Sequence, residues 1–446
     1  MGVMLQRCVV AVSLWCIWSV LAWSAYGQEK SFIVPSNFLD GQSSGSSGVV
    51  QPAYPLPELD RAELPRNSTP HQGLASQITE QWQAGVTEPL LTSENPSLLV
   101  SAKEAKPVAD GKEKCGGIWF TSMSGLVMTR DHANDVELSF STAALNPTLL
   151  TTRDAAMDWA GGFDVHFGRF FNNRQQAWEV VYWGLFSDAE VADATDPDSV
   201  PGGTDLNTAF LFDFLAYNGA GNPVVDLFNG AARHRLVRDY EFHNIEVNLW
   251  GNTNGLEGGR GLEVGWLAGI RFFRFRDSLQ FLTDASDGVF TGAVDEVTYL
   301  VDIENRLLGV QLGGLAQGGV TDHWSLHGGI KVGLFGNHIT NSSELGGAAG
   351  SAFVDDPTSP FHLLQYRIRS HKNDVAILGE IDLGTTYQIR EHWRAFFGYR
   401  AVALAGAALS TNQFPEDFSQ LDEAAVIRSN GSLILHGAYA GIELLY

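Results

Sequence analysis

The sequence predicts an all-β protein, a transmembrane antiparallel up-and-down β-barrel of about ten strands that follows a disordered N-terminal segment. The composition is the first reason. Only 18% of the residues are charged, whereas Gly accounts for 48 residues and aromatic residues for 11% of the chain. Such a composition suits twisted strands with aromatic belts. The second reason is that polarity alternates along the segments, and the third is that short and long connections alternate between them.

The N-terminus has the features of a secretory signal peptide. Arg7 supplies a positive charge, and the apolar run from Cys8 to Trp23 is shorter than the roughly 20 residues that a membrane-spanning helix needs. Ala25-Tyr26-Gly27 places small residues where signal peptidase requires them, so we expect cleavage before Gln28. Residues 1–27 are therefore predicted to be a leader, and the mature protein is predicted to be exported to the bacterial outer membrane.

Residues 28–114 are predicted to be a disordered periplasmic segment. The stretch is rich in Ser, Gly, Pro and Gln and buries too little apolar surface to offset the entropy of ordering. The barrel is expected to occupy residues 115–446. The net charge of −23 argues against nucleic acid as a partner, because phosphates are bound by Lys and Arg.

The clearest strand pattern is a hairpin near the C-terminus. Val375, Ile377, Ile381 and Leu383 share one parity, and Glu380 with its polar neighbours takes the other. A period of two indicates a strand with one apolar and one polar face. Residues 393–401 repeat the pattern after a tight turn at residues 390–392, which predicts an antiparallel pair.

A second hairpin is predicted over residues 296–337, with its turn at residues 318–322. Its outgoing arm alternates regularly from Trp324 to Leu334. The apolar residues of the incoming arm change parity near Asn305, since Val297 to Ile303 are odd-numbered and Leu308 to Leu312 are even-numbered. A change of phase within a strand is typical of a β-bulge, so we expect one there.

The other six strands are predicted over residues 116–128, 157–171, 176–187, 233–250, 261–276 and 433–446. Connections are short after residues 171, 250, 320 and 389 and long between the hairpins. This alternation is typical of outer-membrane barrels, which have short periplasmic turns and long outer loops. Residues 134–141 and 206–217 could add one more pair, which would make the count twelve.

Aromatic residues gather at the strand ends beside the short turns. Amphipathic rings prefer the lipid headgroup level, so these residues are predicted to form a membrane girdle. The predicted girdle consists of Trp178, Trp250, Trp324, Tyr387, Trp393 and Tyr446.

The last strand ends on an aromatic residue of outward parity. The run Tyr439-x-Gly441-x-x-Leu444-x-Tyr446 resembles the C-terminal signal that the bacterial barrel-assembly machinery recognises. Outer-membrane lipid and this machinery are therefore the expected partners.

The region 115–446, about three quarters of the chain, also resembles an uncharacterised family of outer-membrane β-barrels from planctomycete-type bacteria. The resemblance rests on Gly117-Ile118-Trp119-Phe120, on residues 161–168 (GGFDVHFG) leading into a tight turn and Trp178-Glu179-Val180, and on Gly-rich closing strands. The resemblance implies the barrel fold and the outer-membrane location. It implies no catalytic residues.

The inward parity carries charged side chains, which makes the barrel interior the candidate site. Their pairing into a polar plug is the leading expectation, because an unpaired buried charge is costly; a small-solute or ion channel is the alternative. The predicted lining consists of Asp164, His166, Glu263, Arg271, Lys331, Glu380, Asp382, Arg394, Arg400 and Glu443.

The expected role is structural or surface-interacting, with neither an enzymatic activity nor a cofactor or metal. The second alternative is an outer-membrane hydrolase with a site at the outer rim, where Asp213 and His234 are the acid and histidine near strand tops. No nucleophile elbow or phosphate-binding loop appears in the sequence. The ligand of the outer loops is not predicted.

Overall fold

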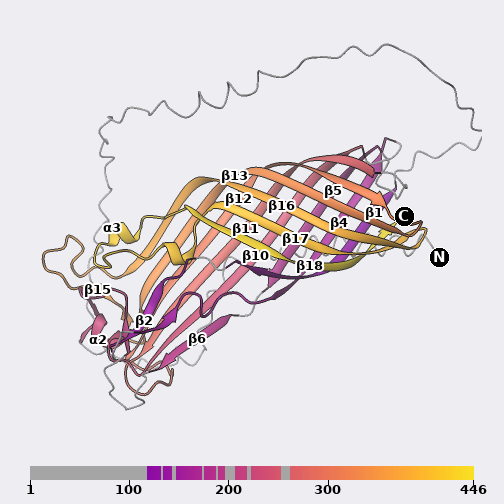
Figure 1. The fold of residues 1–446 in the computed structure, drawn as a ribbon. Coiled ribbons are helices and arrows are strands. Elements are labelled where there is room, and N and C mark those ends of the chain that lie inside the picture. The colour runs from indigo at the N-terminus through magenta and orange to yellow at the C-terminus, as the bar shows by residue number, and fades with distance from the viewer. Residues whose placement is uncertain are drawn as a thin grey trace, which may run out of the picture. The chain divides into compact units, whose positions relative to one another are not determined.

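Ten strands form the wall of a closed antiparallel barrel (Figure 1). The computed structural model describes residues 118–131, 134–142, 147–172, 175–186, 189–195, 206–217, 222–252 and 262–446. Within these residues, each wall strand pairs with its two neighbours in chain order. The wall strands are β1 (Trp119–Arg130), β4 (Ala160–Phe171), β5 (Gln176–Phe186), β10 (Arg233–Gly251), β11 (Leu262–Asp284), β12 (Glu296–Gly319), β13 (Trp324–Gly347), β16 (Arg367–Arg390), β17 (Trp393–Ala407) and β18 (Gly431–Leu445).

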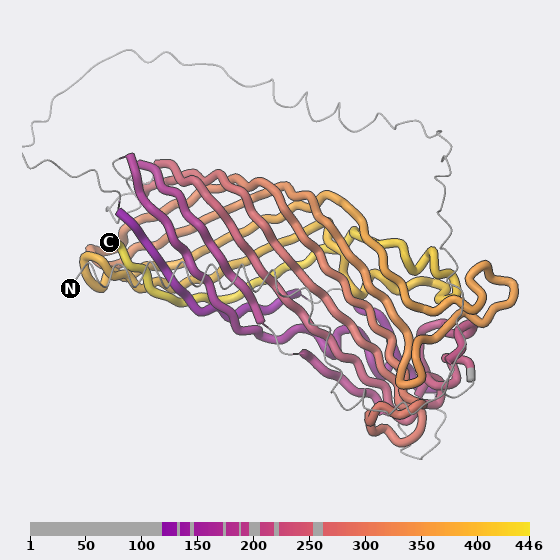
Figure 2. Tube along the Cα trace, turned by 180° about the vertical axis from the view of Figure 1, so that it is seen from behind, coloured from indigo at the N-terminus to yellow at the C-terminus, as the bar shows by residue number. Residues whose placement is uncertain are grey.

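The first and last strands close the barrel. β1 and β18 are antiparallel from Phe120 opposite Leu445 to Arg130 opposite Leu435. The closure continues beyond both strands, because the backbone N–H of Trp119 donates to Tyr446 (2.8 Å) and that of Tyr446 donates to Trp119 (2.9 Å). Full closure leaves no unpaired edge in the membrane, which a spanning sheet requires. Figure 2 shows the tilted strands following one another around the wall. The predicted fold class is therefore confirmed.

The two ends of the barrel differ in their connections. Only residues 320–323 separate β12 from β13, and residues 391–392 separate β16 from β17. We call this the turn end; the C-terminus also lies there (Figure 1). At the opposite end, which we call the loop end, wall strands are joined through residues 131–159, 187–232, 285–295, 348–366 and 408–430. The predicted alternation of short and long connections is present.

Several wall strands reach farther toward the loop end than predicted. β11 continues to Asp284, β13 continues to Gly347, and β16 begins at Arg367. Strands of 23 or 24 residues are about twice the length that crosses a bilayer. The barrel wall therefore extends well beyond the membrane at the loop end.

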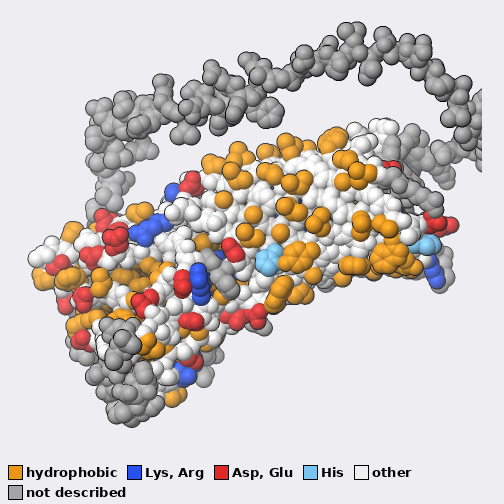
Figure 3. Space-filling view, in the orientation of Figure 1, with side chains coloured by type: hydrophobic (Ala, Val, Ile, Leu, Met, Phe, Trp, Pro, Cys, Tyr) orange, Lys and Arg blue, Asp and Glu red, His pale blue; other side chains and the backbone are white. Residues whose placement is uncertain are grey.

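The wall reverses its polarity along these long strands. Toward the turn end, exposed apolar side chains cover the outer surface, as expected for a lipid-facing belt. The belt includes Val247, Leu249, Val264, Ile270, Leu308, Val310, Leu312, Ile330, Val332, Leu334, Val375, Ile377, Ile381, Leu383 and Ile442. Toward the loop end, charged side chains become frequent on the outer surface (Figure 3), and apolar ones turn inward.

This reversal corrects the predicted β-bulge near Asn305. β12 pairs without any register shift with β11 and with β13, and its odd-numbered residues face inward along the part where apolar residues change parity. Val297 to Ile303 are buried inside the barrel, and Leu308 to Leu312 face outward. The phase of the apolar residues changes because the strand leaves the lipid, not because an extra residue is inserted.

Residues 134–141 and 206–217, the possible eleventh and twelfth strands, are not in the wall. β2 (Glu137–Ser141) pairs with β7 (Leu206–Thr208) and with β3 (Thr148–Thr151) in a separate sheet at the loop end. A second small sheet contains β15 (Phe353–Val354), β8 (Leu215–Tyr217) and β9 (Asn222–Pro223). The remaining elements are β6 (Glu190–Thr195), which pairs with β10, β14 (Gly350–Ser351), α2 (Val224–Phe228), η4 (Ser410–Asn412) and α3 (Leu421–Ala424).

The predictions for the leader and for residues 28–114 lie outside the described residues. In the part of the chain that the structure describes, no helix has the length and apolar character needed to cross a membrane.

Candidate functional site

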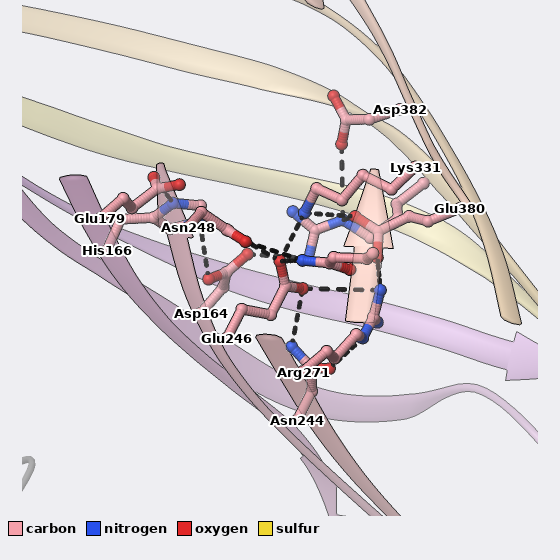
Figure 4. A network of polar contacts seen from close by, with 12 residues as sticks. Asp164, His166, Glu179, Asn244, Glu246, Asn248, Arg271, Lys331, Glu380 and Asp382 are labelled. Carbon is pink, nitrogen blue, oxygen red and sulfur yellow. Dashed lines mark hydrogen bonds and ion pairs between the residues drawn. The ribbon is translucent and has the colours of Figure 1, made fainter. Parts of the chain in front are cut away.

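The middle of the barrel interior contains a box of four charged side chains (Figure 4). Arg271 Nη1 lies 2.8 Å from Glu380 Oε2 and 3.6 Å from Glu246 Oε1. Lys331 Nζ bridges the same two carboxylates, at 3.0 Å from Glu246 and 3.1 Å from Glu380. The side chains of Arg271 and Glu246 have no solvent exposure at all. The two positive and two negative charges alternate, so the box is neutral.

Neighbouring amides complete the hydrogen bonding of the box. Asn244, Glu246 and Asn248 follow one another on the inward face of β10, because residues two apart share a face. The side-chain amide of Asn248 donates to Glu246 (3.0 Å), and that of Gln311 donates to the same oxygen (2.7 Å). A buried carboxylate with this many donors is stabilised in its charged form.

A second group of ions joins the box through Arg400. Its Nη1 lies 2.8 Å from Asp164, and its Nε lies 3.4 Å from Asp382 and 3.8 Å from Glu380. Asp164 in turn contacts His166 (3.0 Å). The ionic contacts therefore form one continuous network across strands from most of the barrel wall.

The network continues toward the turn end into a small cavity. His166 Nδ1 lies 2.6 Å from Glu179, whose second oxygen accepts a hydrogen bond from the indole N–H of Trp250 (2.9 Å). The cavity has a volume of about 270 Å³, and both ions and the rings of Phe120, Phe396 and Trp250 line it. This volume is at the lower limit of ligand pockets, which start near 300 Å³.

Apolar layers lie between the charged box and the loop end. The order is visible along β11, whose inward side chains after Arg271 are Phe273 and Phe275, then Asp277, and then Leu279 and Phe281; all are fully buried. Trp183 packs against Phe273 with ring centroids 5.8 Å apart. Interiors of this kind pack at the density of organic crystals and leave few voids larger than water.

The loops add a further layer inside the loop end. Phe212 of the β7–β8 connection packs on Phe228 of α2 (4.8 Å between ring centroids) and on Phe418 of the β17–β18 connection (4.6 Å). These rings contact Tyr299, which points inward from β12. Residues far apart in sequence thus form one hydrophobic core at the mouth.

The sequence matches a family model described as "Putative beta barrel porin-7 (BBP7)" over residues 121–432. The chain belongs to this BBP7 family. The matched region starts in β1 and ends at the second residue of β18, so it covers nearly all of the wall from β1 to β17. Together with the lipid-facing belt, the family places the protein in the bacterial outer membrane. A comparison with curated proteins found no match.

The BBP7 barrel is also similar to solved outer-membrane proteins. These include the outer membrane protease OmpT from Escherichia coli (10% identity, 74% of this chain and 97% of that chain, TM-score 0.36). They also include a major outer membrane protein from Thermus thermophilus (12% identity, 74% and 99%, TM-score 0.28) and the translocator domain of the autotransporter NalP from Neisseria meningitidis (7% identity, 75% and 90%, TM-score 0.32). At these values the similarities carry no inference about activity.

All the predicted lining residues lie on the inward side of the BBP7 barrel wall. The network unites seven of them, namely Asp164, His166, Arg271, Lys331, Glu380, Asp382 and Arg400. Arg394 and Glu443 form a separate pair (3.6 Å) nearer the turn end, and Glu263 stands apart on β11. Whether any of them lines a conducting path stays a prediction.

Sequence reasoning missed Glu246 and Glu179, which are both buried in the network. The polar alternation of Asn244, Glu246 and Asn248 was the available signal for the first. Glu179 lies among apolar residues of β5, and only its position between Trp178 and Val180 marks its inward parity.

The predicted girdle requires one correction, at Trp250. Its indole points inward to Glu179 and lines the cavity, because even-numbered residues of β10 face the interior. Trp324 and Tyr387 do face outward and pack together (4.9 Å between ring centroids). Trp393 also faces outward. Trp178 packs against the outward ring of Trp119. Tyr446 follows β18 at the turn end. Trp266 is an outward aromatic that the girdle prediction omitted.

The predicted rim residues occupy different environments. His234 is fully buried, with its ring nitrogens bonded to Ser139 Oγ (2.7 Å) and to the carbonyl of Phe228 (2.9 Å), whereas Asp213 is exposed. A hydroxyl beside a histidine is typical of activated nucleophiles, but those need access to substrate. Within the described ranges, no set of three or more His, Cys, Asp or Glu side chains could hold a metal ion.

Proposed function

We propose that the protein is a non-conducting outer-membrane barrel that serves a structural or surface-interaction role and presents a folded layer of loops outside the cell. The observation that supports this most directly is the neutral box of Glu246, Arg271, Lys331 and Glu380 in the middle of the interior. Ions that satisfy one another have little electrostatic reason to exchange with a passing solute.

The apolar layers beyond the box support the same proposal. Phe273, Phe275 and Trp183 are fully buried, and the loop rings form a second hydrophobic cluster nearer the mouth. A hydrated ion that passed between these rings would lose part of its water shell, which makes entry costly. The proposal assigns no catalytic activity, and the burial of His234 supports that part.

The experiment is single-channel conductance of the refolded barrel in planar bilayers, paired with the heat-modifiable gel shift that reports a folded barrel. The expected result is a gel shift without steady conductance steps. The combined variant Trp183→Ala with Phe273→Ala removes two packed rings and should raise conductance, which checks that the assay detects an opened interior. The exterior variant Leu308→Ala is the matched control and should stay silent.

A small-solute or ion channel is the second candidate, because the family description contains the word porin. Steady, ion-selective steps from the unmodified barrel would favour it and overturn the proposal. Substitutions at Glu380, Asp382, Arg394 and Arg400 should then change the ion selectivity.

We further propose export through the leader at residues 1–27 and insertion by the barrel-assembly machinery through β18. The final residue supports the second point, because its backbone hydrogen bonds with Trp119 complete the closure. An origin in planctomycete-type bacteria is proposed from the sequence resemblance alone.

A further inference from the structure

Charged side chains form an ordered ladder on the outer surface of the wall beyond the lipid belt. Asp239 and Glu241 face outward on β10, Arg274 and Arg276 on β11, and Asp302 and Glu304 on β12. Both outward arginines of β11 contact a carboxylate of β12. Arg276 and Asp302 form a bidentate pair (2.9 and 2.8 Å). Arg274 forms an ion pair with Glu304, which also accepts a hydrogen bond from Arg306 (2.7 Å). Acidic and basic strands alternate, so these charges compensate one another.

The alternation fails at β16. Its outward residues at this height are Arg367, Arg369 and His371, and all three are exposed. Arg367 pairs with Glu344 (2.8 Å). In the described part of the chain, no carboxylate lies within ion-pair distance of Arg369 or His371. β17 cannot supply one, because its pairing with β16 starts only at Ile377 opposite Ala405.

The adjacent strand offers hydroxyl groups to the same surface. In the pairing of β13 with β16, Ser342 lies opposite Arg369 and Thr340 lies opposite His371. Directly opposed residues on one face have Cβ atoms about 5 Å apart. His338 follows on β13, where its ring contacts Asn373 (2.8 Å) and lies 6.2 Å from that of His371. We call the surface formed by Arg367, Arg369, His371, His338, Thr340 and Ser342 the basic face.

The other charges around the basic face are already engaged. On the β12 side, Asp302 and Glu304 are opposite Ser342 and Thr340, but both are bound to arginines of the ladder. On the other side, Asp374 pairs with Lys372 (3.0 Å) and accepts from Ser429. Among the residues that the structure describes, no carboxylate therefore neutralises the positive charge of Arg369.

The basic face borders directly on the lipid belt. On β16, Val375 is the second outward residue after His371, and its exposed fraction is 61%. On β13, Leu334 is the second outward residue before His338, and its exposed fraction is 57%. Two outward positions along a strand span about 13 Å. The face thus lies at the height where the apolar surface ends and lipid headgroups begin.

We propose that the basic face binds a phosphate-bearing headgroup of an outer-leaflet lipid, with Arg369 as the main cationic contact. Arginine and hydroxyl groups are suitable donors for phosphate oxygens. A lipid is the occupant that this position favours, because its acyl chains can lie along Val375, Leu334 and their neighbours while the phosphate reaches the donors above. The face is part of the outer wall and independent of the interior, so this proposal goes beyond the proposed function.

The test uses the full-length barrel in phosphatidylcholine nanodiscs that contain either phosphorylated lipid A or its dephosphorylated form. Lipid that stays bound is measured by native mass spectrometry. We expect retention of the phosphorylated form only. Arg369→Gln should lower the retention about fivefold, since one basic residue near a charged lipid surface is worth about 1 kcal/mol, and Arg369→Lys should keep most of it.

Arg235→Gln is the matched control, because it also removes one positive charge from the outer wall at the loop end but on β10, where Arg235 pairs with Asp193 away from the basic face, and it should leave retention unchanged. The heat-modifiable gel shift checks that each variant is folded. If the unmodified protein retained phosphorylated and dephosphorylated lipid A equally, that result alone would overturn the proposal. So would an equal loss in Arg235→Gln, or displacement of the lipid by inorganic phosphate alone, which would indicate a site for free anions.

Discussion

The guanidinium of Arg271 on β11 reaches the carboxylate of Glu380 on β16 at 2.8 Å, although β12 and β13 lie between these strands in the wall. Both side chains point inward, and the curvature of the wall brings them together. The contact is fully buried, so neither charge has water as a substitute partner. The stability of the middle of the barrel should therefore depend on this pair.

Arg271→Met should lower the free energy of unfolding by about 3–5 kcal/mol, because it leaves Glu246 and Glu380 with less compensation in a dry interior. Urea unfolding of the barrel refolded in lipid vesicles measures the change. Arg235→Met is the control: Arg235 pairs with Asp193 on the outer surface (2.7 Å), where an ion pair is worth about 0–1 kcal/mol. Equal losses in the two variants would contradict a special role for the box.

Trp250 and Trp324 should respond differently to a quencher in the lipid. Brominated lipids quench only indoles that contact acyl chains, and Trp324 is exposed outward whereas Trp250 bonds Glu179 inside. Trp324→Phe should reduce the fraction of fluorescence that brominated lipid quenches, and Trp250→Phe should not. The opposite pattern would return Trp250 to the girdle.

Ile381→Arg should cost about 2–4 kcal/mol of folding free energy if its position is near the bilayer midplane. Ile381 faces outward between the inward residues Glu380 and Asp382, and its exposed fraction is 52%. Gln280→Arg places the same charge on the outward face of β11 toward the loop end and should change stability little. A neutral effect of Ile381→Arg would be incompatible with the parity of β16.

Tyr446→Ser should reduce the amount of assembled barrel in cells, because it removes the terminal aromatic ring that the assembly machinery is expected to recognise. The backbone bonds between Tyr446 and Trp119 do not need the ring, so refolding of the purified variant in detergent should be nearly normal. Reduced yield in both settings would instead indicate a loss of stability.

Phe212→Ala should loosen the layer of loops while leaving the membrane-embedded wall intact. Removing a fully buried phenylalanine costs about 3–5 kcal/mol, and Phe212 contacts Phe228 and Phe418 in that layer. Limited proteolysis should cut the loops faster, with an unchanged gel shift of the wall. Leu211→Ala, at an exposed neighbouring position, should have no effect.

Much of the wall could be predicted because strand polarity is a local property. The hairpin of β16 and β17 follows from residues two apart along each strand, and its turn follows from the short gap between Arg390 and Trp393. The inward side of the predicted lining residues follows in the same way. Trp250 faces inward because it shares the parity of Glu246 and Asn248, although its location at a strand end is typical of a girdle residue.

The meeting of particular charges could not be predicted in this way. The contact of Arg400 with Asp164 depends on strand tilt and on closure between β1 and β18, which set the heights of residues 236 positions apart. Glu179 is a single acid in an apolar strand and has no pairing information of its own. The polar alternation around Glu246 marks its inward side but not the cations that it meets.

The sequence by itself determined a wall of about ten antiparallel strands and the lipid-facing parity near the turn end, since these depend on a period of two and on connection length. Only the tertiary structure decided which charges pair inside and where the polarity of the wall reverses. The reversal at Asn305 has the same sequence pattern as a β-bulge. The physical cause of the reversal is different. The loop that contains Phe212 folds into the mouth of the barrel and supplies an apolar interior for Tyr299 and Ile303, and water instead of lipid surrounds this part of the wall.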